Sequence, residues 1–565
     1  MIRRFFGYLS QEVRGLHSAA YILAGAALLS SLLALARDRL MAHNFGAGTE
    51  LDVYYAAFRI PDLIFVATGA LVSVYILIPE LARRTGIDQK RYLDTILAGF
   101  SLFAVIVAFS AALVAPWALE QLYPKLTLSG HLDALVMLTR IMLLQPILLG
   151  LSNILAAVTQ ARGRYTLYAI SPLLYNLGII LGVIVLYPAF GLAGLAWGVV
   201  GGAALHAGVQ IPSVWRDGFL RHVPHVWDMR AVLDTAFVSL PRALTLSMTQ
   251  VSFLGLSVLA ALLAPGSIAI FMFAYNLQAV PLAIIGASYS VAAFPTLAAA
   301  LSAGEREHFL DQVALAARYV LFWSIPATAL LIVLRAYLVR VVLGSGAFDW
   351  TDTRLTAAAF ALLSFSLAAQ GINLLLVRAY YAAGRTFVPF IIACGTALAT
   401  VGLAWWIVVA FENPLLFWAT KALLRVSDVP GSRVLALGIG FALASIGGAL
   451  ALAIHFERRF GGFFARIQRT LFESVAAALA AGIAAYAVLI LVGPIDVGST
   501  TGSVFFRGFA AGLVGLIVAG LSYALMKSVE FAELVTTVRT RIPKVTLPFR
   551  FGTEVTVASS AEDQA

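Results

Sequence analysis

Long apolar runs separated by short polar connections dominate the pattern of this 565-residue chain. A helix needs about 20 apolar residues to cross the roughly 30 Å hydrocarbon core of a membrane. The pattern predicts an all-α polytopic membrane protein with about fourteen transmembrane helices. These cover residues 18–39, 52–82, 93–119, 132–160, 165–187, 190–213, 232–263, 267–300, 309–343, 355–383, 387–411, 433–455, 471–492 and 503–526.

Several of these runs are longer than one crossing requires, and they carry proline near the middle. Proline removes one backbone hydrogen bond and crowds the preceding turn of a helix. We therefore expect kinked helices at Pro61, Pro146, Pro172, Pro281 and Pro326.

Two sequence echoes suggest an internal repeat. Gly150–Arg164 returns 221 residues later as Gly371–Arg385, and both copies end in Gly-Arg. A second echo, at offsets of 218, 220 and 216 residues, pairs Gly48, Pro61 and Pro79 with Gly266, Pro281 and Pro295. Apolar helices resemble one another by composition alone, but the shared order and offset favour a duplicated unit of about 220 residues. Such symmetry is typical of alternating-access transporters.

Composition supports a membrane protein and excludes several other classes. Mean hydropathy is +0.93 and only 12% of residues are charged, more apolar surface than a water-soluble chain of this length can bury. The single cysteine, Cys394, excludes a disulfide framework and a Cys-based metal site. We expect no cofactor and no bound metal.

Enzymatic motifs are absent from the sequence. There is no Walker A loop, HExxH, GxSxG or Cys/His metal spacing, and no repeated aspartate cluster that could hold Mg²⁺. We therefore predict a transporter and not an enzyme or an ATP-driven pump.

The charge pattern predicts an orientation. The net charge of +10 comes from basic residues between apolar spans, so it does not indicate a nucleic-acid partner. Lys and Arg gather in alternate connections, including the N-terminus and the C-terminal tail. The positive-inside rule then places both termini in the cytoplasm.

The repeat and the spans together predict the domain organisation. An N-terminal lobe of six spans (1–213) is followed by a cytoplasmic linker (214–231) and a C-terminal lobe of six spans (232–455). Six crossings per copy give both lobes the same orientation, so the pseudo-two-fold axis runs along the membrane normal. Two extra spans (470–527) and a cytoplasmic tail (528–565) complete the chain.

Three connecting segments carry their own expectations. The polar, aromatic linker is expected to form an interfacial helix. The tail after about Arg541 is expected to be disordered. The stretch 412–433, in which Lys421 and Arg425 lie one helical turn apart, is expected to form an interfacial helix on the outer face.

Charged residues inside spans are costly, so each one is a functional candidate. The densest group straddles the first two spans and consists of Arg37, Asp38, Arg39, Asp52, Arg59 and Asp62. Arg59 and Asp62 share a helix face across Pro61. They could form a structural pair that holds a kinked helix, or they could line a cavity for an anionic substrate.

Other polar residues in spans have two interpretations each. Arg140 and Arg242 could line a cavity or extend to an interface. Gln250, Asn276 and Gln278 could contact sugar hydroxyls, or they could form hydrogen bonds that join helices.

Four segments resemble the MurJ/MviN family of lipid II flippases, within the multidrug/oligosaccharidyl-lipid/polysaccharide exporter superfamily. They are ARDRLMAHNFGAGTELDVYYAAFRIPDL (36–63), SPLLYNLGIILGVIVL (171–186), FGLAGLAWGVVGGAALH (190–206) and GSGAFDWTDTRLTAAAFALLSFSLAAQGINLLLVRAYYA (344–382). The resemblance implies two six-helix lobes around a central cavity and a final helix pair that forms a lipid-facing groove.

The resemblance also implies a function in the bacterial inner membrane. An undecaprenyl-pyrophosphate-linked peptidoglycan precursor would pass through the cavity, with membrane lipids and cell-wall synthesis proteins as further partners. Arg37, Asp52 and Arg59 fall where the family places important charges, and Asp62, Gln250, Asn276 and Gln278 complete the candidate substrate site.

The chain also departs from the family pattern. The family usually has an arginine at three places where this chain does not: at Ser31, at Phe65 or Val66 beyond Pro61, and at Asn276. About half of the expected cationic cavity is therefore missing. Lipid II is the preferred substrate. The alternatives are another undecaprenyl-pyrophosphate-linked oligosaccharide and a non-transporting scaffold of cell-wall assembly, which tight pairing of the cavity charges would favour.

Overall fold

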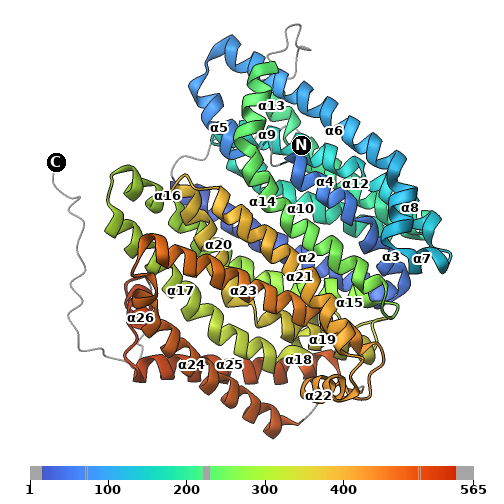
Figure 1. Ribbon diagram of the computed structural model, residues 1–565, viewed down its shortest axis with the longest axis vertical. Coiled ribbons are helices and arrows are strands. Elements are labelled where there is room, and N and C mark those ends of the chain that lie inside the picture. Colours follow the sequence, from blue (N-terminus) through green and yellow to red (C-terminus); the bar gives the residue numbers. More distant parts are fainter. Residues whose placement is uncertain are drawn as a thin grey trace.

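A computed structural model of the protein describes residues 16–69, 72, 74–219, 229–493, 495–496 and 498–541. Every regular element within these ranges is helical, which confirms the predicted all-α class. Figure 1 shows the blue-to-cyan helices gathered on one side of the molecule and the orange-to-red helices on the other. We call residues 16–219 the first half and residues 229–460 the second half.

The first half consists of thirteen helical segments. These are α2 (Leu16–Phe45), α3 (Thr49–Ala57), α4 (Arg59–Gly69), α5 (Val74–Arg83), α6 (Gly86–Leu122), α7 (Pro124–Leu128), α8 (Leu132–Met142), α9 (Leu144–Ala161), α10 (Tyr165–Leu181), η2 (Gly182–Leu186), α11 (Tyr187–Phe190), α12 (Leu192–Gly208) and α13 (Ile211–Arg216).

The second half and the C-terminal helices follow. These are α14 (Met229–Ala261), α15 (Ser267–Leu282), η3 (Ala283–Ala287), α16 (Ser288–Ser302), α17 (Arg306–Val333), α18 (Arg335–Val342), α19 (Trp350–Ser364), α20 (Leu367–Ala382), α21 (Phe387–Ala410), α22 (Pro414–Leu424), η4 (Ser432–Val434), α23 (Leu435–Phe460), α24 (Phe463–Val492), α25 (Thr501–Leu525) and α26 (Val529–Arg541).

Eleven helices in the described ranges are long and apolar enough to cross a membrane, and the bent pair α19–α20 raises that number to twelve. These correspond to the third through fourteenth predicted spans. The first two predicted spans differ from the rest. Helix α2 is continuous, with its apolar run ending at Arg37, Asp38 and Arg39, whereas the second run is divided into α3, α4 and α5. The predicted number of fourteen crossings therefore stays a prediction.

The prolines act in two ways. Pro172, Pro281 and Pro326 lie inside helices, as expected. Pro61 and Pro146 instead lie in the first turns of α4 and α9, just after breaks in the helical run. Proline is well tolerated in the first turn because its missing N–H has no intrahelical partner there. At these two positions we expected a kink within one helix, and the structure instead shows one helix ending and the next beginning.

The first sequence echo occupies matching structural positions in the two copies, and the second does so in part. Gly163 and Gly384 end α9 and α20 with φ of 68° and 66°. The next amide donates five residues back in each copy, from Arg164 to the Thr159 carbonyl and from Arg385 to the Tyr380 carbonyl. Gly48 and Gly266 precede α3 and α15 as their N-cap residues, but with φ of −112° and 84°. Pro61 lies in the first turn of α4 whereas Pro281 lies inside α15, so the two copies fold alike at the first echo and only in part at the second.

Helices α10 and α12 approach closely because glycines line their contact. A Cβ built on Gly178 lies 2.2 Å from the Gly202 Cα, and one built on Gly198 lies 2.5 Å from the Gly182 Cα. Small residues at intervals of four allow membrane helices to pack backbone to backbone. Two of the segments that resemble the MurJ/MviN family, 171–186 and 190–206, contain these glycines.

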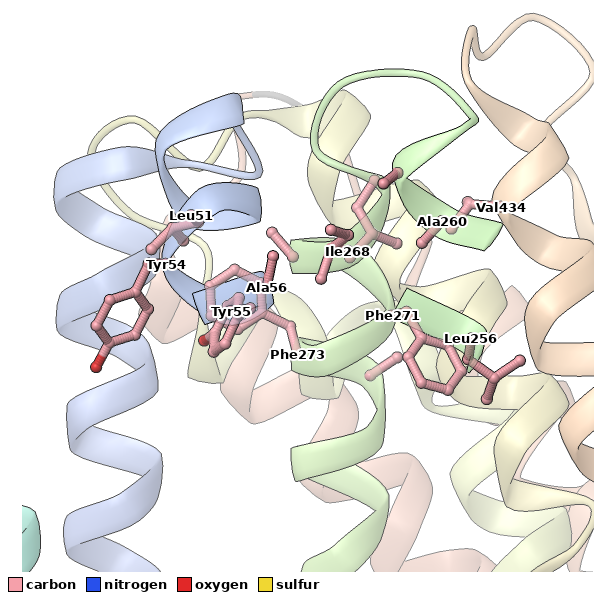
Figure 2. Close-up of a cluster of buried hydrophobic side chains, with 14 of the residues drawn as sticks. Leu51, Tyr54, Tyr55, Ala56, Leu256, Ala260, Ile268, Phe271, Phe273 and Val434 are labelled. Atoms are coloured by element: carbon pink, nitrogen blue, oxygen red, sulfur yellow. The ribbon is translucent and has the colours of Figure 1, made fainter. Parts of the chain in front are cut away.

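The largest apolar core joins the two halves. It includes Leu51 and Tyr55 from α3 together with Ile268 and Phe273 from α15. Figure 2 shows Tyr55 beside Phe273, and their ring centroids are 6.0 Å apart in an edge-to-face arrangement.

The connecting segments agree in part with expectation. Residues 412–433 contain the helix α22, as predicted, with Asn413 capping its N-terminus. The first residues of the predicted cytoplasmic tail form the helix α26 (Val529–Arg541). The interfacial helix expected in the linker and the disordered tail expected after Arg541 fall largely outside the described residues.

Candidate functional site

Arg37 lies in a polar cluster that both halves build. Its Nε and Nη2 donate to Oδ1 of Asp38 over 3.0 and 2.8 Å, and its Nη1 donates to Asn176 Oδ1 over 3.2 Å. Asn276 of α15 completes the cluster by donating to Asp38 Oδ2 over 3.0 Å. Two predicted site residues, Arg37 and Asn276, therefore meet through Asp38, which neutralises the arginine.

Arg59 is buried and lies against an aromatic wall. Its guanidinium is 6.0 Å from the Phe253 ring centroid, and its Nε donates to the Tyr55 carbonyl. Asp62 lies 3.8 Å from Nη2 of Arg59 and accepts a hydrogen bond from Gln145. The Arg59–Asp62 ion pair is therefore looser than the Arg37–Asp38 pair.

Asp52 serves the junction between the halves. Its Oδ2 accepts from the Gly266 amide over 2.6 Å and its Oδ1 accepts from the Ala269 amide over 2.9 Å. Both amides belong to the N-terminus of α15, where unpaired N–H groups and the helix dipole favour a carboxylate. Asp52 thus caps a helix of the other half and holds it in place.

The two predicted glutamines lie apart from the charged cluster. Gln278 is completely buried on α15, and neither its Nε2 nor its Oε1 has a hydrogen-bond partner among the described residues. Leaving a buried amide unsatisfied costs about 1–3 kcal/mol, so this side chain marks a place where a ligand or a second conformation can supply partners. Gln250 is half-buried on α14.

A cavity of about 560 Å³ lies within the second half. Two arginines, Arg242 and Arg378, line it together with hydroxyl and amide side chains. No Asp or Glu is found among the described residues that line it. Its polar residues are Thr245, Thr249, Ser252, Gln370, Asn373, Tyr381, Thr396, Thr400 and Ser445. Such a lining suits an anion that carries hydroxyl groups.

Aromatic side chains connect the surroundings of Arg59 with the lining of this cavity. The Phe253 ring lies 4.5 Å from Tyr275 and 6.2 Å from Phe441, measured between centroids. Tyr275 and Phe441 both line the cavity, and Arg59 lies on the Phe253 side. Arg59 therefore lies against Phe253, which packs against two aromatic residues of the cavity lining. We call Phe253, Tyr275 and Phe441 the aromatic partition.

Sequence reasoning missed most of this cavity. It named Arg242 without deciding between a cavity and an interface, and it overlooked Arg378. Arg378 belongs to the Gly371–Arg385 echo, and an arginine in a strongly apolar helix was a signal available from the sequence. By contrast, Arg140 is exposed and donates to the Ala112 carbonyl.

Hydrogen bonds between the halves gather at one end of the molecule, which we call the contact end. Arg39 donates to the carbonyls of Val341 and Val342, the Ala347 amide donates to the His43 carbonyl, and the Ala47 amide donates to Asp352. Lys125 donates to the Leu262 and Leu263 carbonyls near the end of α14. Together with the Asp52 bonds, these contacts fasten the halves where α2 ends and α15 begins.

Comparison with known proteins identifies relatives along most of the chain. Residues 41–506 match the family model described as lipid II flippase MurJ. A probable lipid II flippase MurJ of Buchnera aphidicola is 26% identical over 375 residues, covering 64% of this chain and 72% of the relative. The lipid II flippase MurJ of Burkholderia cenocepacia is 25% identical over 403 residues, covering 68% and 77%.

Solved structures share the fold. A lipid II flippase MurJ in an inward closed conformation matches with a TM-score of 0.69 and 19% identity, covering 91% of this chain and all of that one. An inward-facing multidrug resistance MATE family transporter matches with a TM-score of 0.62 and 16% identity, covering 79% and 98%. With the family model matching from residue 41 to residue 506, the chain belongs to the lipid II flippase MurJ family.

Proposed function

We propose that this protein is a flippase that moves lipid II, a lipid-linked peptidoglycan precursor, from the inner to the outer leaflet of the bacterial cytoplasmic membrane by alternating access. The relatives named above carry that activity in their names. The structural observation that carries the proposal is the contact end. Two halves whose mutual hydrogen bonds gather at one end can open at either end by exchanging one set of contacts for another.

The orientation of the protein supports this cycle. The two halves correspond to the proposed lobes, 1–213 and 232–455, and the positive-inside pattern places both termini in the cytoplasm. Helix α2 then runs outward, so the contact end faces the exterior. A molecule closed there is ready to receive substrate from the cytoplasmic side.

In the first half the positive charge of Arg37 is neutralised by Asp38, so we look to the cavity of the second half for the cationic groups that bind the substrate. A diphosphate entering a low-dielectric cavity needs compensating charge, because an unpaired buried charge costs several kcal/mol. Arg37 is paired with Asp38, and Arg242 and Arg378 line a cavity among whose described lining residues there is no carboxylate. Arg378 also donates to the Ala287 carbonyl over 3.2 Å and to the Ser290 hydroxyl over 2.6 Å. We assign the substrate headgroup to this cavity, with Arg59 behind the aromatic partition.

The substrate's other parts and the energy source follow from the same proposal. Threonine, serine and asparagine side chains suit saccharide hydroxyls, and the pair α24–α25 offers an apolar surface for a prenyl chain. The sequence has no ATP-binding motif, so the membrane potential is the proposed driving force, at about 2.3 kcal/mol per charge per 100 mV. We further propose that the protein catalyses no covalent reaction.

One observation favours the scaffold alternative. Arg37 is paired with Asp38 and Arg59 lies near Asp62, so the predicted charge cluster is nearly neutral. A protein that only assembles cell-wall enzymes would need such pairs and no transport cavity. The arginine-lined cavity in the second half argues for transport.

The deciding experiment measures flipping by the purified protein. Proteoliposomes containing the full chain and fluorescent lipid II are expected to expose the lipid on the opposite leaflet faster than protein-free vesicles. A second lipid-linked oligosaccharide, used in parallel, distinguishes the alternative substrate. Complementation of a strain depleted of its lipid II flippase tests the same function in cells. Correctly inserted protein that neither flips lipid II nor rescues growth would contradict the proposal.

A further inference from the structure

A second cavity lies at the contact end, on the side of the C-terminal helices. This groove, which we call the outer groove, has a volume of about 590 Å³. It is formed by α18, the start of α19, the end of α22 and the end of α24. Most of its lining is aliphatic or aromatic, but three arginines are among its residues, namely Arg335, Arg354 and Arg425.

Only one of the three arginines is neutralised. Arg354 forms two hydrogen bonds to the carboxylate of Asp428, over 2.6 and 2.7 Å. Arg335 donates to the Ile332 carbonyl and Arg425 donates to the Tyr486 hydroxyl. Within the described ranges, no Asp or Glu oxygen lies within 4.0 Å of a nitrogen of either residue.

Arg335 and Arg425 line the same groove. Tyr486 lines it as well, and its hydroxyl accepts a hydrogen bond from Arg425 over 2.7 Å. Bringing two guanidinium groups together at a partly apolar site is unfavourable unless an anion lies between them. Phosphate is the anion that guanidinium groups bind best, because two N–H donors match two phosphate oxygens.

The surroundings of the outer groove indicate a lipid. Helix α22 exposes Leu415, Trp418 and Leu423 at 73%, 64% and 82%, and Lys421 lies on the same short helix. Apolar and aromatic residues beside basic ones are typical of a helix lying in a membrane interface. The end of α24 adds Ile490 and Leu491, exposed at 65% and 85%. Acyl chains would cover these residues, whereas a free phosphate ion would leave them exposed.

We propose that the outer groove binds a phospholipid with a net negative headgroup, its phosphate between Arg335 and Arg425 and its acyl chains along α22 and α24. This site is separate from the arginine-lined cavity of the second half and shares no lining residue with it. Neighbouring α18 also carries the carbonyls that Arg39 holds at the contact end. A lipid in the outer groove therefore stabilises α18, and with it the closed contact end.

The test measures binding of radiolabelled short-chain phosphatidylglycerol to the full-length protein in a neutral detergent. Saturable binding is expected, with phosphatidylcholine and inorganic phosphate competing about tenfold more weakly or worse. The double variant Arg335→Gln/Arg425→Gln should bind about tenfold more weakly or worse, and Arg335→Lys/Arg425→Lys should retain part of the affinity. The exposed Arg433→Gln is the matched control, since it removes a charge beyond the outer groove.

Thermal unfolding separates a binding role from a structural one. If the two arginines serve the lipid, the glutamine double variant is as stable as wild type, or more so, in lipid-free detergent, because a repulsion is removed. Phosphatidylglycerol should then raise the unfolding midpoint of wild type and of Arg433→Gln but not of the double variant. Equal competition by phosphatidylcholine or by inorganic phosphate would overturn the proposal, as would undiminished binding to the double variant.

Discussion

The carboxylate of Asp52 accepts a hydrogen bond from the amide of Gly266, 214 residues further along the chain, over 2.6 Å. The contact joins the second predicted span to the start of α15. Gly266 has φ of +84°, and a Cβ on it would lie 1.8 Å from the Ala47 carbonyl oxygen. The backbone of one half thus passes against the backbone of the other, and only glycine permits both the conformation and the approach.

Gly266→Ala is expected to open the contact end. Alanine at this φ costs about 1 kcal/mol, and the clash with Ala47 adds to that cost. The unfolding midpoint should fall. Ser257 is buried, so the reporter Ser257→Cys is introduced in a background in which Cys394 is replaced by alanine. In the Gly266→Ala protein this reporter should become reactive to an impermeant maleimide. Gly395→Ala is the control, because a Cβ there has nothing within 4 Å. Equal reactivity in the two variants would contradict this account.

Asp52→Asn keeps the shape of the side chain but removes its charge. The α15 N-terminus loses a charge-assisted bond, and we expect a loss of about 1–2 kcal/mol in the stability of the contact end. The same Ser257→Cys labelling measures this loss as faster modification. Glu412→Gln removes an exposed acid and should have no effect. If Asp52 instead contacted substrate, lipid II transport would fall while labelling stayed at the wild-type rate.

The helices and the breaks beside Pro61 and Pro146 could be predicted from the sequence, but the contacts between distant segments could not. An apolar run of membrane length is a local property, so the third through fourteenth spans agree with the structure. The cap that Asp52 provides depends on Gly266, 214 positions away. The sequence shows which charged residues lie inside predicted spans. It does not show which of these residues form ion pairs or hydrogen bonds.

The candidate site was predictable to the same limited extent. Arg37 and Asn276 could each be selected as intramembrane polar residues, but their meeting through Asp38 depends on how α2 and α15 cross. Arg378 lies inside the echo Gly371–Arg385, which indicates the internal repeat. Its place in a cavity depends on the packing of α20 against its neighbours, which no single-sequence pattern contains.

Arg378→Gln is expected to reduce lipid II transport more than Arg37→Gln. One charge-assisted bond to phosphate is worth about 1.5–3 kcal/mol, which corresponds to roughly a tenfold or larger loss. Arg37 is already satisfied by Asp38, so its loss should act mainly through stability. Initial flipping rates in proteoliposomes, matched for protein content, measure the difference, with the exposed Arg433→Gln as control. If Arg37→Gln reduced transport more than Arg378→Gln at equal stability, the headgroup site would have to be assigned to the first half.

Gly198→Ala tests the packing of α10 on α12. A Cβ at Gly198 would lie 2.5 Å from the Gly182 Cα, so the helices must separate. We expect a loss of about 1–3 kcal/mol, as in other overpacked cores. The unfolding midpoint in detergent measures this loss. Gly201→Ala, on the same helix and with nothing within 4 Å, should match wild type. Equal midpoints for the two variants would show that α10 and α12 do not pack through Gly198.

Docking of α26 is expected to depend on pH through Glu530. Burial opposes the charge of this carboxylate, but its own backbone amide, the Thr470 hydroxyl and Arg318 outweigh that effect and lower its pKa. A lowered pKa in the folded state stabilises docking above the unfolded value and loses that contribution as pH falls through the folded value. Docking should therefore be constant near neutrality and weaken below about pH 4.5.

A spin label at the exposed Thr536 reports this docking as restricted motion. In wild type the label should become mobile only in the acidic range. Glu530→Gln has no charge to lose, so its label should be equally mobile at pH 7 and at pH 4, and more mobile than wild type at pH 7. Exposed Glu412→Gln should reproduce the wild-type profile. A Glu530→Gln protein whose label still loosens on acidification would assign the transition to another group, because the carboxylate that holds α26 would be absent.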